Sequence, residues 1–115
     1  METINQGTGM PLADERCKPC RTGERKLPAA DAVALLGELD DWIYYPDRIE
    51  KRWEFKGYKR ALTLVASIAE IAHQQDHHPE IRFGWGYVEV VLNTHSVGGL
   101  SRNDFIVAAQ IDAVA

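Results

Sequence analysis

The sequence predicts an α+β fold, with a four-stranded antiparallel sheet, three helices packed on one face, and the order α-β-β-α-β-β-α. Three observations predict it. An apolar stripe of helical period runs through residues 57–75, and aromatic segments flank a turn between residues 42 and 55. Residues 87–94 alternate between apolar and polar side chains, as a half-buried strand does. Because the expected strands follow one another in pairs joined by short turns, hairpins and an antiparallel sheet are predicted.

The N-terminal half of the domain is expected to form a helix followed by a hairpin. Residues 29–39 carry apolar side chains at helical spacing after Pro28, a residue that suits a helix start. Residues 42–55 are aromatic and β-compatible around the Pro46-Asp47 turn, so they predict two strands. Alternate residues of the second strand share one face of the sheet, namely Ile49, Lys51, Trp53 and Phe55.

The C-terminal half is expected to form a second hairpin and a last helix. Residues 81–85 predict a short strand and residues 87–94 a longer alternating one, joined by a glycine-bracketed bend. Ser101 then caps the last helix, with Asp104 at its third position as in a capping box. Capping explains Asp104 as well as a role in a site does, so both interpretations stay open.

The bulk composition is that of an ordinary globular protein. The 115 residues are 45% hydrophobic and 26% charged, which predicts one domain over residues 27–115 after a flexible tail over residues 1–26. A net charge of −4 offers no broad positive surface for nucleic acid. The chain has no apolar run near the roughly 18 residues of a membrane span and no secretory signal. A cytoplasmic location is therefore expected, with no membrane partner.

The predicted tail holds the only two cysteines, Cys17 and Cys20, as a single CxxC pair. In a reducing compartment such a pair stays as thiols. Because four ligands are usual, the pair could supply at most half of a structural zinc site, which two subunits could complete between them. A redox pair would need a strand–helix junction that the polar tail lacks. We expect two thiols without function in a mobile tail.

All four histidines lie between residues 73 and 95. His73 and His77 are four residues apart near the end of the long helix, His78 follows, and His95 lies at the end of the longest strand. If the helix packs on that strand, the four imidazoles border one pocket. Imidazole exchanges protons near neutrality, so the cluster predicts acid–base chemistry. Zinc binding is the chemical alternative, although Gln74 stands where a zinc protease helix has its glutamate.

The segment HQQDHHPEIRFGWGYVEVVLNTHSVGGLSRNDF resembles the signature of the pterin-4a-carbinolamine dehydratases, also called 4a-hydroxytetrahydropterin dehydratases. That signature has an HHP, a polar residue four positions before it, and an aromatic, a histidine and an aspartate at set distances after it. The positions that match it are His73, His77, His78, Pro79, Trp85, His95 and Asp104. The similarity covers about residues 29–112, and it departs from many members in having His73 in place of a glutamate.

The resemblance implies a hydro-lyase that dehydrates 4a-hydroxytetrahydropterin to quinonoid dihydropterin, recycling the pterin cofactor of aromatic amino acid hydroxylases. Such an elimination needs one acid and one base, and no metal or redox cofactor. By similarity, His77 and His95 donate protons to the leaving hydroxyl, while His78 binds the pterin and accepts the N5 proton. The other residues expected at the site are Asp76, Thr94 and Ser96 as substrate contacts, and His73, Trp42, Trp85 and Asp104 as supporting groups.

Two further expectations concern partners. The sheet face without helices, which includes Val91, would be exposed in a monomer, so a homodimer or homotetramer is expected. Some relatives of this fold act as partners of other proteins, so the alternative function is a non-catalytic protein-binding or assembly module. The complete set of histidines with Asp104 favours the enzyme.

Overall fold

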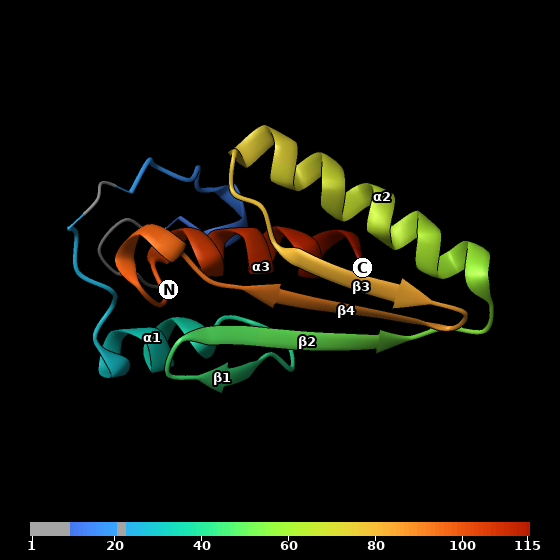
Figure 1. Ribbon diagram of the computed structural model, residues 1–115, viewed down its shortest axis with the longest axis horizontal. Helices are drawn as coiled ribbons and strands as arrows, with labels where there is room; N and C mark the ends of the chain where they lie inside the picture. Colours follow the sequence, from blue (N-terminus) through green and yellow to red (C-terminus); the bar gives the residue numbers. More distant parts are fainter. Residues whose placement is uncertain (1–9, 21–22) are drawn as a thin grey trace.

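The protein contains a four-stranded antiparallel sheet in the order β1-β2-β4-β3. The computed structural model describes residues 10–20 and 23–115, and it confirms the predicted fold and order of elements (Figure 1). The strands are Ile43–Tyr45 (β1), Arg48–Glu54 (β2), Glu80–Gly84 (β3) and Tyr87–Leu92 (β4). The helices are Ala29–Leu36 (α1), Tyr58–Gln75 (α2) and Arg102–Val114 (α3), with 3-10 turns at Leu12–Asp14 (η1) and His95–Val97 (η2).

Strand β4 is central because its alternating side chains supply the inner face of the sheet. Its residues Val88, Val90 and Leu92 are completely buried, and it pairs with β2 on one side and β3 on the other. These side chains belong to one core cluster with buried residues of all three helices, among them Phe105 of α3. The predicted alternation of β4 and its inward face are confirmed.

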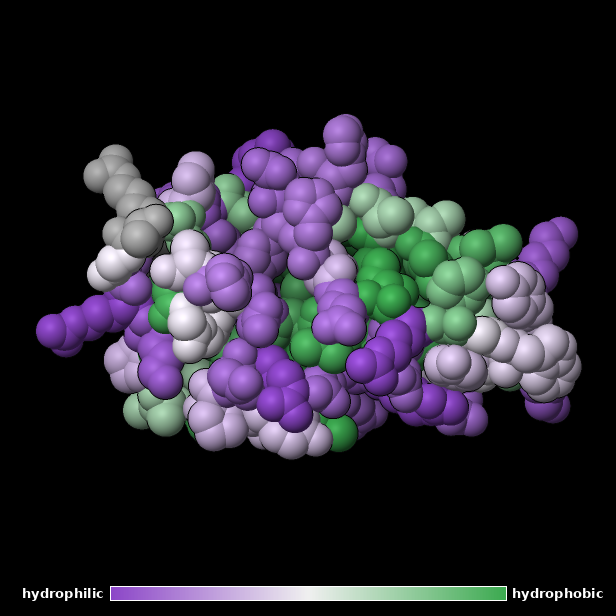
Figure 2. Space-filling view, viewed as in Figure 1, coloured by the Kyte–Doolittle hydropathy of each residue, from purple (hydrophilic) through white to green (hydrophobic). Residues whose placement is uncertain are grey.

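The open face of the sheet is charged rather than apolar. Arg52 of β2 bonds Glu54 and also reaches Glu89 of β4, and Val91 is only partly exposed. Antiparallel sheets tolerate a solvated polar face, so this face alone does not demand a second subunit. Figure 2 shows hydrophobic residues at the surface over the half of the molecule that contains α2 and β3. The homo-oligomer stays a prediction.

The N-terminal segment that the structure describes, residues 10–20, packs against α3 instead of lying loose. Leu12 is buried in the core, and the Gln110 side chain donates to the carbonyls of Ala13 and Glu15 at 3.2 and 3.1 Å. Arg102 makes a two-pronged ion pair with the Glu15 carboxylate, at 2.8 and 2.7 Å. The boundary at residue 27 stays a prediction, but residues 10–20 contribute to the packed body.

Smaller differences concern the ends of the helices. Helix α1 ends at Leu36, three residues before the predicted end, and Val114, the last residue of α3, is exposed. Among the described residues, no helix is long and apolar enough to cross a membrane.

Candidate active site

The candidate site begins where α2 ends. Asp76 adopts the left-handed conformation, with φ 49° and ψ 43°, and the His77 amide donates to the Ala72 carbonyl at 3.2 Å. A left-handed residue at the end of a helix reverses the chain and satisfies its last carbonyls. The turn brings His77 toward the first turn of α3. The proline after the two histidines favours this ending, because the residue before a proline avoids the α region.

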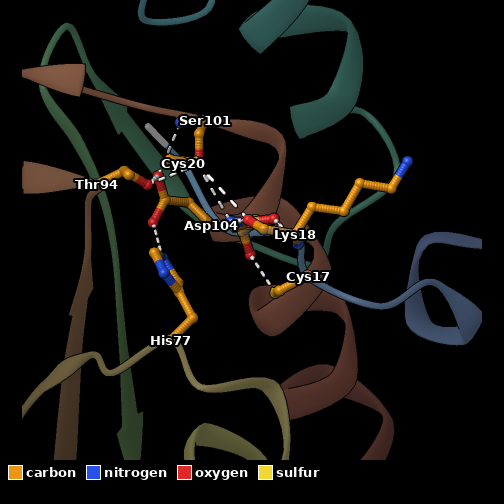
Figure 3. A network of polar contacts seen from close by, with 8 residues as sticks. Cys17, Lys18, Cys20, His77, Thr94, Ser101 and Asp104 are labelled. Carbon is orange, nitrogen blue, oxygen red and sulfur yellow. Dashed lines mark hydrogen bonds and ion pairs between the residues drawn. The ribbon is translucent and has the colours of Figure 1, made fainter. Parts of the chain in front are cut away.

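Asp104 is the centre of the polar network at this point (Figure 3). Its side chain is completely buried, and one oxygen, Oδ1, lies 2.7 Å from His77 Nε2. The other oxygen, Oδ2, accepts the Ser101 amide at 2.9 Å and the Thr94 hydroxyl at 2.8 Å. The Thr94 and Ser101 hydroxyls also bond one another at 2.6 Å. Three groups that can donate therefore converge on one carboxylate, which keeps it satisfied without water.

The two interpretations of Asp104 turn out to be compatible. The predicted capping box is present, with Ser101 and Asp104 each bonding the other's backbone amide. The same carboxylate contacts His77, so its capping oxygen is Oδ2 and its histidine oxygen is Oδ1.

This geometry assigns different tasks to the two nitrogens of His77. Because an ionised carboxylate only accepts hydrogen bonds, Nε2 must carry the proton in its contact with Asp104. Nδ1 is then the nitrogen left for exchange with a ligand. The His77 side chain is 13% exposed, so the ring is held in place yet not sealed off. A histidine oriented by a buried carboxylate in this way has the arrangement of a general acid or base.

A pocket of about 410 Å³ opens beside His77. Four of the predicted site residues line it, namely Asp76, His77, Thr94 and Ser96. The remaining wall comes from residues that the sequence did not single out for this site, namely Cys17, Lys18, Pro19, Cys20, Gln74, Gln75 and Asn103. Its volume lies within the range of small-molecule sites.

The other three histidines have exposed side chains, and none of them is among the residues that line this pocket. His73 is on the last turns of α2, and His78 directly follows His77. His95 lies between two lining residues, at the start of η2. The structure therefore brings the turn after α2 and the turn at η2 together at this pocket. Among the described residues, His77 is the one histidine whose ring is held by a carboxylate.

The two tryptophans lie elsewhere. The Trp42 indole is buried, donates to the Asp112 carboxylate at 3.0 and 3.1 Å, and packs edge-on to Trp53. Asp112 is two helical turns beyond Asp104, about 12 Å along α3. Trp85 is 74% exposed at the turn between β3 and β4, at the opposite end of β3 from the histidines. Neither indole is among the groups that line the pocket, and Trp42 belongs to the hydrophobic core.

The zinc alternative finds no ligand set. Within residues 10–20 and 23–115, no three histidine, cysteine or acidic side chains form a group that could hold a metal ion. Burial, with smaller contributions from the nearby Asp104 and Cys20, raises the pKa of the Cys17 thiol to about 12. A thiol with so high a pKa is a poor nucleophile near neutrality.

Comparison with known sequences points to one family. Residues 25–114 match the family described as pterin 4 alpha carbinolamine dehydratase. A protein of Nitrosospira multiformis that carries the provisional name pterin-4-alpha-carbinolamine dehydratase is 41% identical over 103 residues, which cover 90% of this chain and 91% of that protein. A protein of Vibrio cholerae with the same provisional name is 42% identical over 107 residues, covering 90% and 98%.

Solved structures agree with the sequence relatives. The transcriptional coactivator/pterin dehydratase from Brucella melitensis superposes with a TM-score of 0.75 at 30% identity, over 79% of this chain and 99% of its own. A pterin dehydratase-like protein identified as a RuBisCO assembly factor in the alpha-carboxysome has a TM-score of 0.55 at 24% identity, covering 67% and 89%, and shares the fold alone. On the match over residues 25–114 and relatives above 40% identity, the chain belongs to the pterin-4-alpha-carbinolamine dehydratase family.

Proposed function

We propose that this protein dehydrates 4a-hydroxytetrahydropterin to quinonoid dihydropterin and water by histidine acid–base catalysis. The observation that carries the proposal is the buried Asp104 carboxylate holding His77 Nε2 at 2.7 Å beside an open pocket. We take the substrate class from the family to which the chain belongs, and we place the substrate in the pocket beside His77.

In the proposed reaction the C4a–O bond breaks and a C4a=N5 double bond forms. Hydroxide is a poor leaving group, so protonated His77 gives the proton on Nδ1 to the departing oxygen while Asp104 keeps the proton on Nε2. His95, on the other turn that borders the pocket, is the donor for the opposite stereoisomer. His78 accepts the proton that N5 loses, so one proton enters the leaving water and one leaves the ring.

The substrate contacts proposed for Asp76, Thr94 and Ser96 differ in their support. All three line the pocket. The Thr94 hydroxyl is engaged by Asp104 and Ser101, so its role is to hold the carboxylate in place. Asp76 and Ser96 are exposed and can reach a ligand. An Asp carboxylate suits the donor-rich amide and amino edge of a pterin.

The direct test is a stopped-flow assay of 4a-hydroxytetrahydropterin decay with and without the protein. We expect His77→Ala, His78→Ala and His95→Ala each to lower the rate about 10²-fold or more. The losses at His77 and His95 should depend on which 4a stereoisomer is supplied. Arg82→Ala, on an exposed side chain of the charged face, is the control and should leave the rate unchanged. Three histidine variants with parental rates would overturn the assignment.

Two further readouts accompany this assay. Activity should survive exhaustive dialysis against EDTA, because imidazole protons suffice for the elimination. Light scattering tests the proposed homodimer or homotetramer, for which a monomeric mass at micromolar concentration would be decisive against it. In cells, the proposed role is to recycle the cofactor of a pterin-dependent hydroxylase in the cytoplasm.

A further inference from the structure

A four-residue strap, residues 17–20, runs from α2 to α3 beside the candidate site. At one end the Cys17 amide donates to the Gln75 side-chain oxygen at 2.8 Å. At the middle the Lys18 amide donates to Asn103 Oδ1 at 3.0 Å, and Asn103 Nδ2 donates back to the Lys18 carbonyl at 2.6 Å. The Ser96 hydroxyl reaches the Cys20 carbonyl at 3.4 Å. The strap therefore contacts α2, α3 and the turn that carries His95.

The strap is also one wall of the histidine pocket. All four of its residues line the same 410 Å³ cavity as His77 and Thr94. Figure 3 shows Cys17 and Lys18 on one side of Asp104 and His77 on the other, with the Lys18 side chain directed away from His77. The wall thus consists of two thiols, a proline ring and main chain. Most of the polar groups of that main chain are hydrogen-bonded to other parts of the protein.

Asn103 holds the strap in place by hydrogen bonds, as Asp104 holds the His77 ring. Asn103 is 7% exposed, and both ends of its amide are used by Lys18. Its backbone carbonyl also accepts the Cys17 thiol at 3.6 Å. Because Asn103 and Asp104 are neighbours in the first turn of α3, one helical turn holds two sides of one pocket.

We propose that the strap is part of the substrate-binding surface and that Asn103 is its positioning residue. The proposal rests on the proposed function for the identity of the ligand, which is a flat, uncharged heterocycle of the pterin class. A wall of thiols, a proline ring and bonded main chain, with the Lys18 cation directed away from His77, fits the edge of a ring through contact and exclusion of water. The strap precedes residues 25–114, which match the family model, but it lies within the part of the chain that aligns with the Nitrosospira multiformis and Vibrio cholerae relatives, since each alignment covers 90% of this chain.

The cysteines provide a test that does not depend on turnover. They are the only two thiols in the chain, so alkylation by iodoacetamide reports on the strap alone. Cys20 is partly exposed and is the reporter. We expect saturating 7,8-dihydrobiopterin to slow its alkylation about tenfold, with pterin occupancy followed separately by fluorescence quenching. Equal alkylation rates with and without bound pterin would overturn the proposal, as would failure of the pterin to bind.

The kinetic test separates positioning from folding. Asn103→Ala should raise KM about tenfold with kcat and the pH profile unchanged, the pattern of lost binding that is equal in ground and transition states. Gln110→Ala is the matched control, because it also removes two bonds to the N-terminal main chain but at Ala13 and Glu15, away from the pocket. Its KM should not change. A fall in kcat with constant KM for Asn103→Ala would overturn the positioning role.

A second variant covers the case in which Asn103→Ala fails to fold. Cys20→Leu keeps both hydrogen bonds between Asn103 and Lys18 and loses only the long contacts of the Cys20 sulfur, at 3.4 Å to Asn103 Nδ2 and 3.9 Å to the Lys18 carbonyl. It enlarges one side chain on the wall, so KM should rise while the unfolding midpoint stays near the parental value. Unchanged KM in that variant would overturn the proposal. Pterin binding with Cys20 protection but no turnover would refute the proposed reaction and support the strap. Turnover without protection would do the reverse.

Discussion

Replacing Asp104 by asparagine should reverse the direction of the hydrogen bond to His77. The Asn side-chain oxygen can take the place of Oδ2, where the Ser101 amide and the Thr94 hydroxyl both donate. The amide nitrogen then faces His77 Nε2, and a side-chain NH₂ only donates. His77 must accept at Nε2 and carry its proton on Nδ1, and it can no longer hold protons on both nitrogens without setting two donors face to face.

The structure sets the size of the effect. Asp104→Asn keeps two of the three hydrogen bonds unchanged, reverses the third and loses the charge, so the free energy of unfolding should fall by about 1 kcal/mol. Asp104→Ala also loses the cap and leaves the buried Ser101 amide unpaired, which together predict a loss of about 3 kcal/mol. Turnover of Asp104→Asn should fall about 10² to 10⁴-fold, because the proposed acid is no longer available.

Two measurements check this prediction. Urea unfolding gives the stability of each variant, and stopped-flow decay of 4a-hydroxytetrahydropterin gives the rate. Long-range ¹H–¹⁵N spectra of the imidazoles show which nitrogen of His77 is protonated, which is the direct readout of the reversed bond. If Asp104→Asn keeps the Nε2-protonated form, or retains turnover within about threefold of the parental rate, the reasoning is refuted.

Three other groups give independent predictions. Because burial raises the pKa of Cys17 to about 12, its alkylation rate, measured by mass spectrometry, should keep rising up to about pH 11, and a plateau near pH 9 would contradict this. Hydrogen bonding to Arg102 lowers the pKa of Glu15 below its ordinary 4.5, so the native protein should be more stable than Glu15→Gln at pH 7. That difference should vanish as the pH falls through the lowered value, and a constant difference in unfolding midpoint would argue against the ion pair. Lys51→Ala breaks the nearly buried Lys51–Asp112 ion pair, so the free energy of unfolding measured in urea should fall by about 2 kcal/mol while turnover stays unchanged. A loss of turnover would show that this end of α3 is coupled to the site.

The parts of the fold that could be predicted are those determined by local pattern. The alternation of β4 and the stripe of α2 locate buried faces because burial selects apolar side chains at the period of each element. Pairing of β2 with β4, which places β4 in the centre, joins residues about 40 apart and has no local signal. The charge of the open face was visible in Arg52 and Glu54, yet its ion pair to Glu89 depends on that pairing.

The N-terminal segment could not be predicted for a related reason. Its order comes from polar side chains far away in the sequence, with Gln75, Asn103 and Gln110 bonding its main chain across separations of 58, 85 and 95 or more residues. Hydrogen bonds to a main chain need no particular side chain on the segment itself, so its sequence shows no apolar period. The only local signal was Leu12, a single apolar residue that proves to be buried.

The same argument explains why a capping pattern alone did not decide the role of Asp104. A capping box needs only one carboxylate oxygen, since the Ser101 amide is a single donor. The second oxygen, Oδ1, remains available for a hydrogen bond to a group at the end of α2. The left-handed turn at Asp76 places His77 in that position. Because capping fixes the rotamer of Asp104, it also fixes where Oδ1 points, and hence the orientation of the imidazole. Stability of α3 and orientation of His77 are therefore two consequences of one side-chain conformation, and a variant that removes the side chain, such as Asp104→Ala, should lose both together.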